Sequence, residues 1–274
     1  MPELPEVETV KESLKLRLIG KRIKKVNILW DNIIAYPSKE AFIKEITDKT
    51  IVDITRRGKF LMFDLDDYYL LSHLRMEGKY FFKDHDELIG KHEHVIFELD
   101  DSIDLRYMDT RKFGKMYLIN KNDITSIGPI KDLGLEPWDD NLNSGYLISK
   151  YKGKNIPIKS VLLDQSIIVG IGNIYADEIL FLCKINPLRR ASSINEDEAN
   201  DIIFYTKEVL ERAIVKGGTT IRSYSSVDGV HGLFQHELLV HGKDNSFCPN
   251  CGSEILKIKV GGRGTYFCNS CQKE

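Results

Sequence analysis

The sequence predicts an α+β protein with two domains: an N-terminal antiparallel β-sandwich flanked by helices, and a C-terminal helical domain that ends in a four-cysteine zinc finger. Three observations lead to this prediction. Short apolar runs separated by turn residues fill the N-terminal part, helical periodicity replaces them in the C-terminal part, and two C-x2-C pairs close the chain. A length of 274 residues is sufficient for two domains that each have a core.

The chain opens with MPELPEVETV, and an amphipathic helix is expected from Pro5 onward. Proline is tolerated where a helix begins, because its missing N–H would have no partner there, and Glu6 and Glu8 suit the positive end of the helix. One apolar stripe consists of Val7, Val10, Leu14 and Leu18. None of this explains Pro2, since chain ends are usually frayed and chemically idle.

Strand-like runs follow at the spacing of an antiparallel sandwich or barrel, and a helix at 39–46 interrupts them. Turn signals such as Arg57-Gly58 and Glu77-Gly78 separate neighbouring runs. The predicted strands are 22–29, 51–56, 59–65, 69–75, 78–82, 93–99, 103–107 and 115–119.

A stretch rich in Gly, Asp and Asn, from Gly134 to Gly145, is typical of a linker, and the pattern beyond it is helical. Helices are expected at 156–164, 173–183 and 196–215, the last with Asn195 and Glu198 as a capping box. The Gly/Ser-rich loop that follows has a length usually associated with function or disorder. The predicted parts are a domain at 1–134, a linker at 135–148, a domain at 149–235 and a zinc finger at 236–274.

Composition indicates a globular protein of the cytoplasm, with 42% hydrophobic and 29% charged residues and no apolar run of membrane-spanning length. A net charge of −2 argues mildly against nucleic acid as a partner, but remote acidic residues do not cancel a local basic patch. Basic residues cluster at 21–25, 56–59 and 111–115, and each cluster is equally consistent with a solvated face.

The cysteines at the C-terminal end predict one tetrahedral Zn²⁺ site. Two C-x2-C pairs at this separation offer four thiolates, whereas two disulfides are disfavoured in a cytosolic chain. Four thiolates fill the coordination shell, so this zinc is expected to be structural. Its ligands are Cys248, Cys251, Cys268 and Cys271. Cys183, among apolar neighbours, is expected to be a core thiol.

The segment VGGRGTYFC between the two cysteine pairs has two interpretations. It is either a glycine-rich hairpin turn with an incidental arginine, or a zinc-supported hairpin on which Arg263 offers several donors to a phosphate. The spacing alone does not separate them.

Five short motifs precede the zinc finger: MPELPEVET at the start, RRGKF at 56–60, SHLRMEG at 72–78, DTRKFG at 109–114 and GIGNIYADE at 170–178. Together with the zinc finger, they resemble the bacterial formamidopyrimidine-DNA glycosylases, base-excision repair enzymes that remove 8-oxoguanine and ring-opened purines. The resemblance covers the whole chain and includes the zinc finger. The family also implies a helix–two-turn–helix element around the last of these motifs.

The resemblance implies a role for Pro2. Once Met1 is removed, Pro2 carries a secondary amine that attacks the sugar C1′, forms a Schiff base and leads to β,δ-elimination. Glu3 is expected to be the general acid/base, Glu6 to order the terminus, and Lys59 to complete the catalytic group by contacting a phosphate beside the lesion.

The resemblance also implies a set of DNA contacts. Met76, Arg111 and Phe113 match the residues that fill the gap left by an everted nucleotide, with Arg111 pairing to the orphaned cytosine. Asn173 is expected to bind a phosphate, and Lys159 to lie near the lesion nucleotide. His73, Arg75 and Arg263 are further expected DNA contacts, and the loop over the damaged base is expected to use Thr219, Thr220, Arg222 and Tyr224.

The expected partner is double-stranded DNA with an oxidised purine, preferably opposite cytosine, bound by a monomer in a bacterial cytoplasm. An endonuclease VIII-like enzyme for oxidised pyrimidines and a non-catalytic zinc-ribbon DNA-binding protein are the alternatives. The chain departs from the family's common residues at Asn186, His241, Lys243 and Phe247, which predicts weaker or more salt-sensitive DNA binding.

Overall fold

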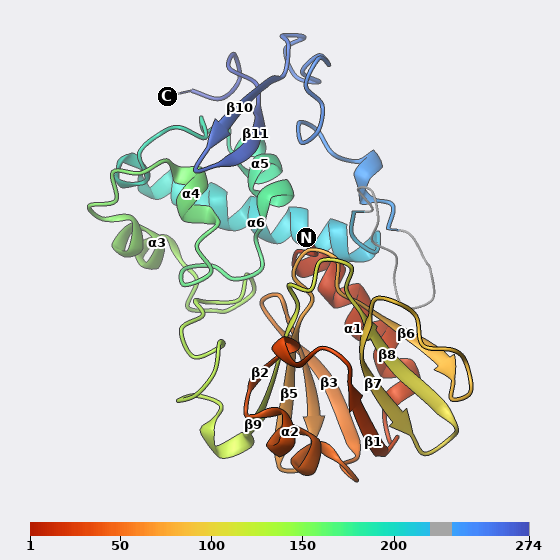
Figure 1. Ribbon diagram of the computed structural model, residues 1–274. Helices are drawn as coiled ribbons and strands as arrows, with labels where there is room; N and C mark the ends of the chain where they lie inside the picture. Colours follow the sequence, from red (N-terminus) through yellow and green to blue (C-terminus); the bar gives the residue numbers. More distant parts are fainter. Residues whose placement is uncertain (220–231, 274) are drawn as a thin grey trace. The chain divides into compact units, whose positions relative to one another are not determined.

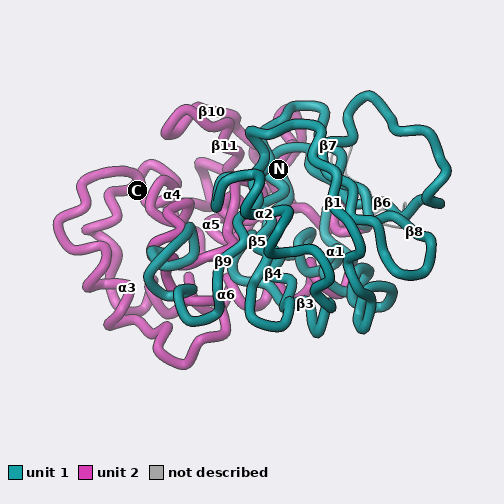
Figure 2. Tube along the Cα trace, turned by 60° about the horizontal axis from the view of Figure 1, so that its bottom comes forward, with its two compact units in different colours: residues 1–132, 217–232 teal, residues 133–216, 233–274 magenta. Residues whose placement is uncertain are grey.

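The computed structural model describes residues 1–219 and 232–273. The chain forms two compact units (Figure 2). Unit 1 comprises Met1–Asp132 and Gly217–Gly232, and unit 2 comprises Leu133–Lys216 and Leu233–Glu274. The predicted fold class is confirmed: unit 1 holds two β-sheets with flanking helices, and unit 2 holds helices and the four-cysteine module.

Unit 1 begins with α1 (Leu4–Leu18), and its described residues form nine strands in two sheets. Figure 1 shows both sheets. One sheet has the order β1-β7-β8-β6 and the other has the order β2-β9-β5-β4-β3. The elements are β1 (Ile23–Ile28), β2 (Ile34–Tyr36), α2 (Lys39–Ile46), β3 (Ile51–Arg57), β4 (Phe60–Leu65), β5 (Tyr68–His73), β6 (Lys79–Asp84), β7 (Glu93–Leu99), β8 (Ile103–Met108) and β9 (Lys115–Asn120).

Every strand predicted in this part of the chain is present, and the structure adds β2. β2 pairs in parallel with β9 and was not predicted because it is only three residues long and precedes Pro37. The other pairings are antiparallel. The core contains apolar side chains from strands of both sheets, such as Phe63 and Phe97, together with the predicted stripe of α1.

Two connections cross from one sheet to the other at the same end of unit 1. β5 leads into β6 through residues 74–78, and β8 leads into β9 through residues 109–114. β5 pairs with β9, with His73 opposite Lys115, and β6 pairs with β8, with Lys79 opposite Met108. The two connections therefore start and finish on paired strands, at the end of the sandwich where the N-terminus lies (Figure 1).

Arg106 on β8 holds the long connection between β6 and β7 in place. Its guanidinium is buried and forms ion pairs with Glu93 at 3.0 Å and Asp104 at 2.9 Å. It also donates to the carbonyl oxygens of Asp84, Glu87 and Leu88. A buried charge is tolerated only when it is paired and hydrogen-bonded, and Arg106 satisfies both conditions.

Unit 2 contains α3 (Ser144–Tyr151), α4 (Ile158–Leu162), α5 (Asn173–Leu182), α6 (Glu196–Val215) and the hairpin β10 (Leu256–Val260) and β11 (Arg263–Phe267). The helices predicted at 173–183 and 196–215 are present, and α4 is shorter than the predicted helix. α3 begins inside the predicted linker, where Asn143 caps it by accepting from the Tyr146 N–H at 2.9 Å. The predicted domain boundaries stay a prediction.

Within residues 1–219 and 232–273, none of the helices combines the length and apolar character needed to cross a membrane.

We expect Arg106→Leu to lower the free energy of unfolding by about 3–5 kcal/mol, because it removes the buried cation that Glu93 and Asp104 share and leaves them with Lys83 and His85 as their partners. Urea denaturation measures the loss. Arg22→Leu, at an exposed position of unit 1, is the matched control and should change stability by no more than about 0.5 kcal/mol. Equal stabilities of the two variants would contradict a structural role for the Arg106 network.

Candidate functional site

The N-terminal residues of unit 1 are ordered by α1. Pro2 and Glu3 are buried, and helix α1 starts directly after them at Leu4. The Glu3 N–H donates to Glu6 Oε2 at 2.8 Å, which provides one of the first helical N–H groups with an acceptor. The end of the chain that holds Pro2 is therefore fixed by the side chain of Glu6.

The second oxygen of the Glu6 carboxylate binds a distant part of unit 1. Glu6 Oε1 accepts from the Thr219 N–H at 2.7 Å and from its hydroxyl at 3.1 Å. Gly218 has φ +78°, and a Cβ atom there would lie 2.6 Å from Glu6 Oε1, so this position requires glycine. Glu6 thus joins the start of α1 to the residue that precedes 220–231. Thr220, Arg222 and Tyr224 lie outside the described residues.

Lys59 lies in the tight turn between β3 and β4, and its side chain is largely buried. Arg56 supports this turn, because its guanidinium donates to the Gly58 carbonyl at 3.0 Å and to the Glu8 carboxylate at 2.9 Å. Glu8 is on the first turns of α1, so Arg56 connects the N-terminal helix to the turn that carries Lys59.

His73, at the end of β5, is buried and electrically neutral. Burial and the nearby cations of Arg75 and Lys59 lower the pKa of His73 to about 3. The Arg75 N–H donates to His73 Nδ1 at 2.9 Å, which leaves the ring proton on Nε2. The ring also packs edge-on against Phe60, with 4.6 Å between the ring centroids.

The two connections between the sheets present the remaining predicted contacts of unit 1. Met76 and Phe113 are 40% and 49% exposed, which is unusual for large apolar side chains with no covering element, and Arg111 is exposed beside Phe113. The Arg111 guanidinium lies 4.8 Å from the centroid of the Phe113 ring. Arg75 is exposed as well, in the left-handed conformation with φ 53°.

Asp109, which the sequence did not identify, orders the second of these connections. It is fully buried, and its carboxylate accepts from the N–H groups of Arg111, Phe113 and Gly114 at 2.8–2.9 Å. An aspartate that begins a turn and precedes a glycine is a recognisable turn signal, and it could have identified this role.

Lys159 of unit 2 is fully buried and faces the zinc-finger hairpin. Its ammonium forms an ion pair with Asp177 at 2.8 Å and donates to the Gly264 carbonyl at 3.1 Å and the Thr265 hydroxyl at 2.7 Å. A buried ammonium needs an opposite charge beside it, and Asp177 supplies that charge. The predicted contact of Lys159 with a lesion nucleotide stays a prediction, and this burial argues against it.

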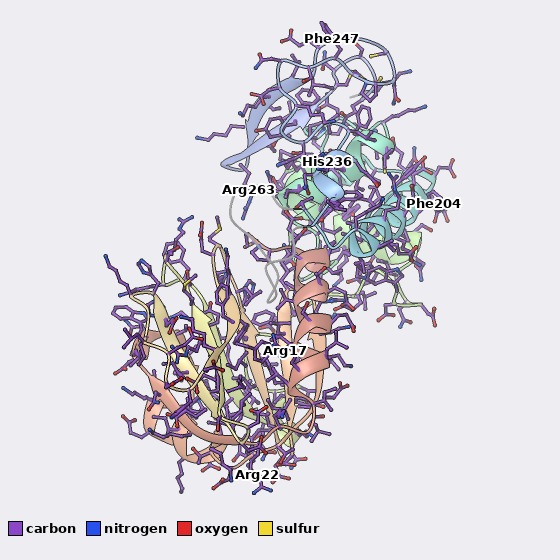
Figure 3. The ribbon with its side chains drawn as sticks, turned by 90° about the vertical axis from the view of Figure 1, so that its right-hand side faces the viewer. Arg17, Arg22, Phe204, His236, Phe247 and Arg263 are labelled. Atoms are coloured by element: carbon purple, nitrogen blue, oxygen red, sulfur yellow. The ribbon has the colours of Figure 1, made fainter. Side chains whose placement is uncertain are left out.

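Asn173 and Arg263 are brought together by the same hairpin. Asn173 is the first residue of α5, and its side-chain amide donates to the Gly264 carbonyl at 2.9 Å. Arg263 precedes Gly264 and is exposed at the free end of the hairpin (Figure 3). A helix N-terminus beside an exposed guanidinium is suited to bind an anion.

Two carboxylates in the apolar helix α5 join the zinc-finger region to the helices. Glu178 accepts from the N–H groups of Leu239, Val240 and His241 at 2.7–3.0 Å. Burial raises the pKa of Glu178, although these donors and His241 act in the opposite direction. Asp177 pairs with Lys159 and with His241 Nδ1 at 2.7 Å. The sequence signal for both was a pair of acids between apolar residues.

The residues that depart from the family's common pattern have different environments. His241 belongs to the Asp177 cluster, and Asn186 is buried with its Oδ1 accepting from the Leu188 N–H at 3.0 Å. Phe247 is exposed at the far end of the zinc finger from Arg263 (Figure 3), and Lys243 is half-buried. Their predicted effect on DNA affinity stays a prediction.

The four predicted zinc ligands converge on one point. The sulfur atoms of Cys248, Cys251, Cys268 and Cys271 all lie within 4.8 Å of one another. A tetrahedral Zn²⁺ with bonds of about 2.3 Å separates its sulfur ligands by about 3.8 Å, so the four thiols fit one structural zinc ion. Cys183 is buried away from this group, and burial raises the pKa of its thiol.

Three family models match the chain. They are the formamidopyrimidine-DNA glycosylase N-terminal domain at residues 1–116, the formamidopyrimidine-DNA glycosylase H2TH domain at 133–225, and the zinc finger found in FPG and IleRS at 245–273.

Curated relatives and solved structures agree with these matches over the whole length. The formamidopyrimidine-DNA glycosylase of Oceanobacillus iheyensis is 46% identical over 273 residues, covering 99% of this chain and 98% of that protein. The Bacillus subtilis protein of the same name is 45% identical, covering 99% of each. A point mutant of Lactococcus lactis FPG, in complex with Fapy-dG-containing DNA, has a TM-score of 0.94 at 40% identity and full coverage of both chains. L. lactis Fpg in complex with abasic-site DNA has a TM-score of 0.93 at 40% identity, covering 99% of this chain and all of that one.

We expect removal of zinc to unfold the segment 248–271, because the binding free energy of a structural zinc is also folding free energy. Treatment with a chelator should abolish the near-ultraviolet circular dichroism of Tyr266, and elemental analysis should find one zinc per chain before treatment. Cys251→Ser should reproduce the loss, whereas Cys183→Ser should retain the metal. Folded protein without zinc would contradict the assignment.

Burial of neutral His73 predicts a pH-dependent stability. Its pKa is lower in the folded chain than the unfolded value of about 6.5, so the unfolded state binds more protons below that pH. Stability is therefore full above about pH 6.5 and is lost as pH falls toward 3. Between about pH 7 and pH 5, the protonation of His73 in the unfolded chain lowers the free energy of unfolding by about 2 kcal/mol. Urea unfolding should show a shallower pH dependence for His73→Gln, with the exposed His236→Gln as the control.

Proposed function

The chain belongs to the formamidopyrimidine-DNA glycosylase family and is a DNA glycosylase of base-excision repair, and from this premise we propose that it excises oxidised purines from duplex DNA and then cleaves the abasic strand. The proposed substrates are 8-oxoguanine and formamidopyrimidines. Fapy-dG and abasic DNA occupy the L. lactis neighbours, which supports both steps. The observation that carries the proposal is the buried, ordered segment Pro2-Glu3 at the start of α1.

The proposed nucleophile is the amine of Pro2 after removal of Met1. An α-amino group has a pKa of about 8, against about 10.4 for lysine, so much more of it is neutral at pH 7. Attack on C1′ forms the C1′–N bond and breaks the glycosidic bond, and the base leaves with its electron pair and gains a proton. Opening of the sugar ring then gives an iminium, which acidifies the C2′ proton and allows elimination of the 3′ and then the 5′ phosphate.

Glu3 is the proposed general acid/base, since it directly follows the nucleophile and is 2% exposed. Glu6 has a different proposed role. Its carboxylate is occupied by the N–H of Glu3 and by Thr219, so it orients the terminus and does not move protons. The shared carboxylate also ties the terminus to Thr219, the first of the proposed base-contacting residues Thr219, Thr220, Arg222 and Tyr224.

The other proposed roles concern the DNA. Lys59, with His73 and Arg75 nearby, contacts the phosphate beside the lesion. Met76, Arg111 and Phe113 occupy the gap left by the everted nucleotide, and Arg111 reads the opposite cytosine. Their exposure on ordered connections supports this proposal.

In unit 2, Asn173 and Arg263 are the proposed phosphate ligands, and Lys159 supports them by holding Gly264 between them. The zinc ion, when bound, supplies no chemistry and fixes the hairpin that presents Arg263. We propose that the enzyme acts as a monomer.

The test of the proposed chemistry is borohydride trapping on duplexes that carry 8-oxoguanine opposite each of the four bases. We expect a covalent adduct on Pro2 with Met1 absent, found by mass spectrometry after digestion, and the fastest reaction opposite cytosine. Borohydride reduces the iminium to a stable amine, so the adduct marks the nucleophile. Preferential trapping on oxidised pyrimidines would instead indicate an endonuclease VIII-like specificity.

Variants at the two ends of the chain provide the controls. One extra residue before Pro2 converts its amine into an amide, whose lone pair is delocalised, and should abolish trapping. The same extension after Glu274 should leave trapping intact. Pro2→Gly, which retains a free primary amine, should keep partial activity at most. A stable adduct on Lys59 would overturn the mechanism.

A further inference from the structure

We propose that Tyr107 is a positioning residue that fixes the connection carrying Met76 against the connection carrying Arg111 and Phe113, so that these side chains enter the DNA as one body. The inference rests on the proposed function, since it takes these three residues to fill the gap left by the everted nucleotide. It goes beyond that function because Tyr107 is 0% exposed and therefore closed to DNA.

The topology places the two connections side by side. The first connection runs from β5 in the five-stranded sheet to β6 in the four-stranded sheet, and the second returns from β8 to β9. Because β5 pairs with β9 and β6 pairs with β8, the two connections start and finish on neighbouring strands. Tyr107 is the penultimate residue of β8, opposite Tyr80 at the start of β6. Its side chain therefore lies in the core at the point where the two connections leave the sheets.

The Tyr107 hydroxyl touches the main chain of both connections. A Cβ atom built on Gly114 would lie 1.8 Å from this oxygen, and one built on Gly78 would lie 2.1 Å from it. Contacts this short do not occur, so each connection needs a glycine where it meets Tyr107. Gly78 ends the connection that carries Met76, and Gly114 ends the connection that carries Phe113.

Neither Tyr107 nor the connections can easily move away from this contact. The Tyr107 ring packs edge-on against Tyr80 at 5.1 Å, and the Tyr80 hydroxyl donates to Ser72 Oγ at 2.7 Å. The first connection is closed by the Gly78 N–H, which donates to the Leu74 carbonyl at 2.9 Å. The second is ordered by the buried carboxylate of Asp109.

A displacement of one connection is therefore transmitted to the other through the buried phenol of Tyr107. Thr110 and Glu77 add a link between the connections at 3.3 Å, but this pair is exposed and contributes little by comparison. Fixed spacing matters for insertion into DNA because a misplacement of about 1 Å can lower a rate by about 10²-fold.

The experiment is a double-mutant cycle on single-turnover excision of 8-oxoguanine opposite cytosine. Met76→Ala, Phe113→Ala and the double variant are compared in the native chain and in Tyr107→Phe, which removes only the hydroxyl. In the native chain we expect the two substitutions to be non-additive by about fivefold or more. In Tyr107→Phe they should become additive, because the oxygen that couples the connections is absent.

Tyr80→Phe is the matched control, since it removes a buried hydroxyl from the same ring pair without touching either connection. The cycle should stay non-additive in this background. A second arm uses Gly114→Ala, which should lower excision by roughly tenfold. Adding Tyr107→Phe should restore part of that loss, because it removes the atom that the new methyl group meets at 1.8 Å. Thermal unfolding verifies that each variant is folded.

Coupling that survives in Tyr107→Phe, or a Gly114→Ala defect that Tyr107→Phe leaves unchanged, would overturn the role of Tyr107 alone. Single variants Met76→Ala and Phe113→Ala with native excision rates would overturn the gap-filling function and this inference together. Trapping of the Pro2 adduct on abasic single strands, which contain no gap to fill, reports separately on the chemistry.

Discussion

The pairing of β5 with β9 and of β6 with β8 is the constraint on which the candidate site of unit 1 depends. Because each pair lies in a different sheet, the chain must cross between the sheets twice at the same end. That end also receives the β3–β4 turn with Lys59, since Phe60 lies opposite His73 in the ladder. Backbone pairing alone therefore places residues that are far apart in the sequence at one end of the sandwich.

Buried side chains then fix the exposed ones at this edge. Asp109 and Tyr107 act from inside the fold, where their contacts are dry and close. Glu6 is buried as well, with one carboxylate oxygen toward Glu3 and the other toward Thr219. Met76, Arg111 and Phe113 remain outside and exposed. Buried side chains in close contact thus hold the exposed groups in fixed places, as a binding surface requires.

Local patterns were sufficient to predict most of the fold. The strands of unit 1 were visible because short apolar runs alternate with strong turn residues, and the zinc ligands because their spacing is specific. Helix α3 was missed because Asn143 and Gly145 resemble a linker when their capping geometry is unknown.

The resemblance identified the exposed residues of the site, and their roles stay predictions. It did not identify Tyr107, Asp109 or the Asp177 cluster, because these depend on contacts between residues distant in the sequence. Gly78 and Gly114, at the ends of two motifs, were the available signal.

The contact between Lys159 and the hairpin has a consequence for how this chain can be recombined. Small zinc fingers are often regarded as modules that shuffle between proteins, since four cysteines and a metal are enough to fold them. Here the carbonyl of Gly264 and the hydroxyl of Thr265 serve as acceptors for an ammonium that belongs to α4, and Asp177 of α5 balances its charge. A finger transplanted from an unrelated protein would bring its metal site but would leave this ammonium and its carboxylate without the third member of their cluster. The finger and the helices are therefore one inheritable unit, and they also share a core, since Phe181 of α5 packs in one buried cluster with Ile255 and Cys268 of the finger.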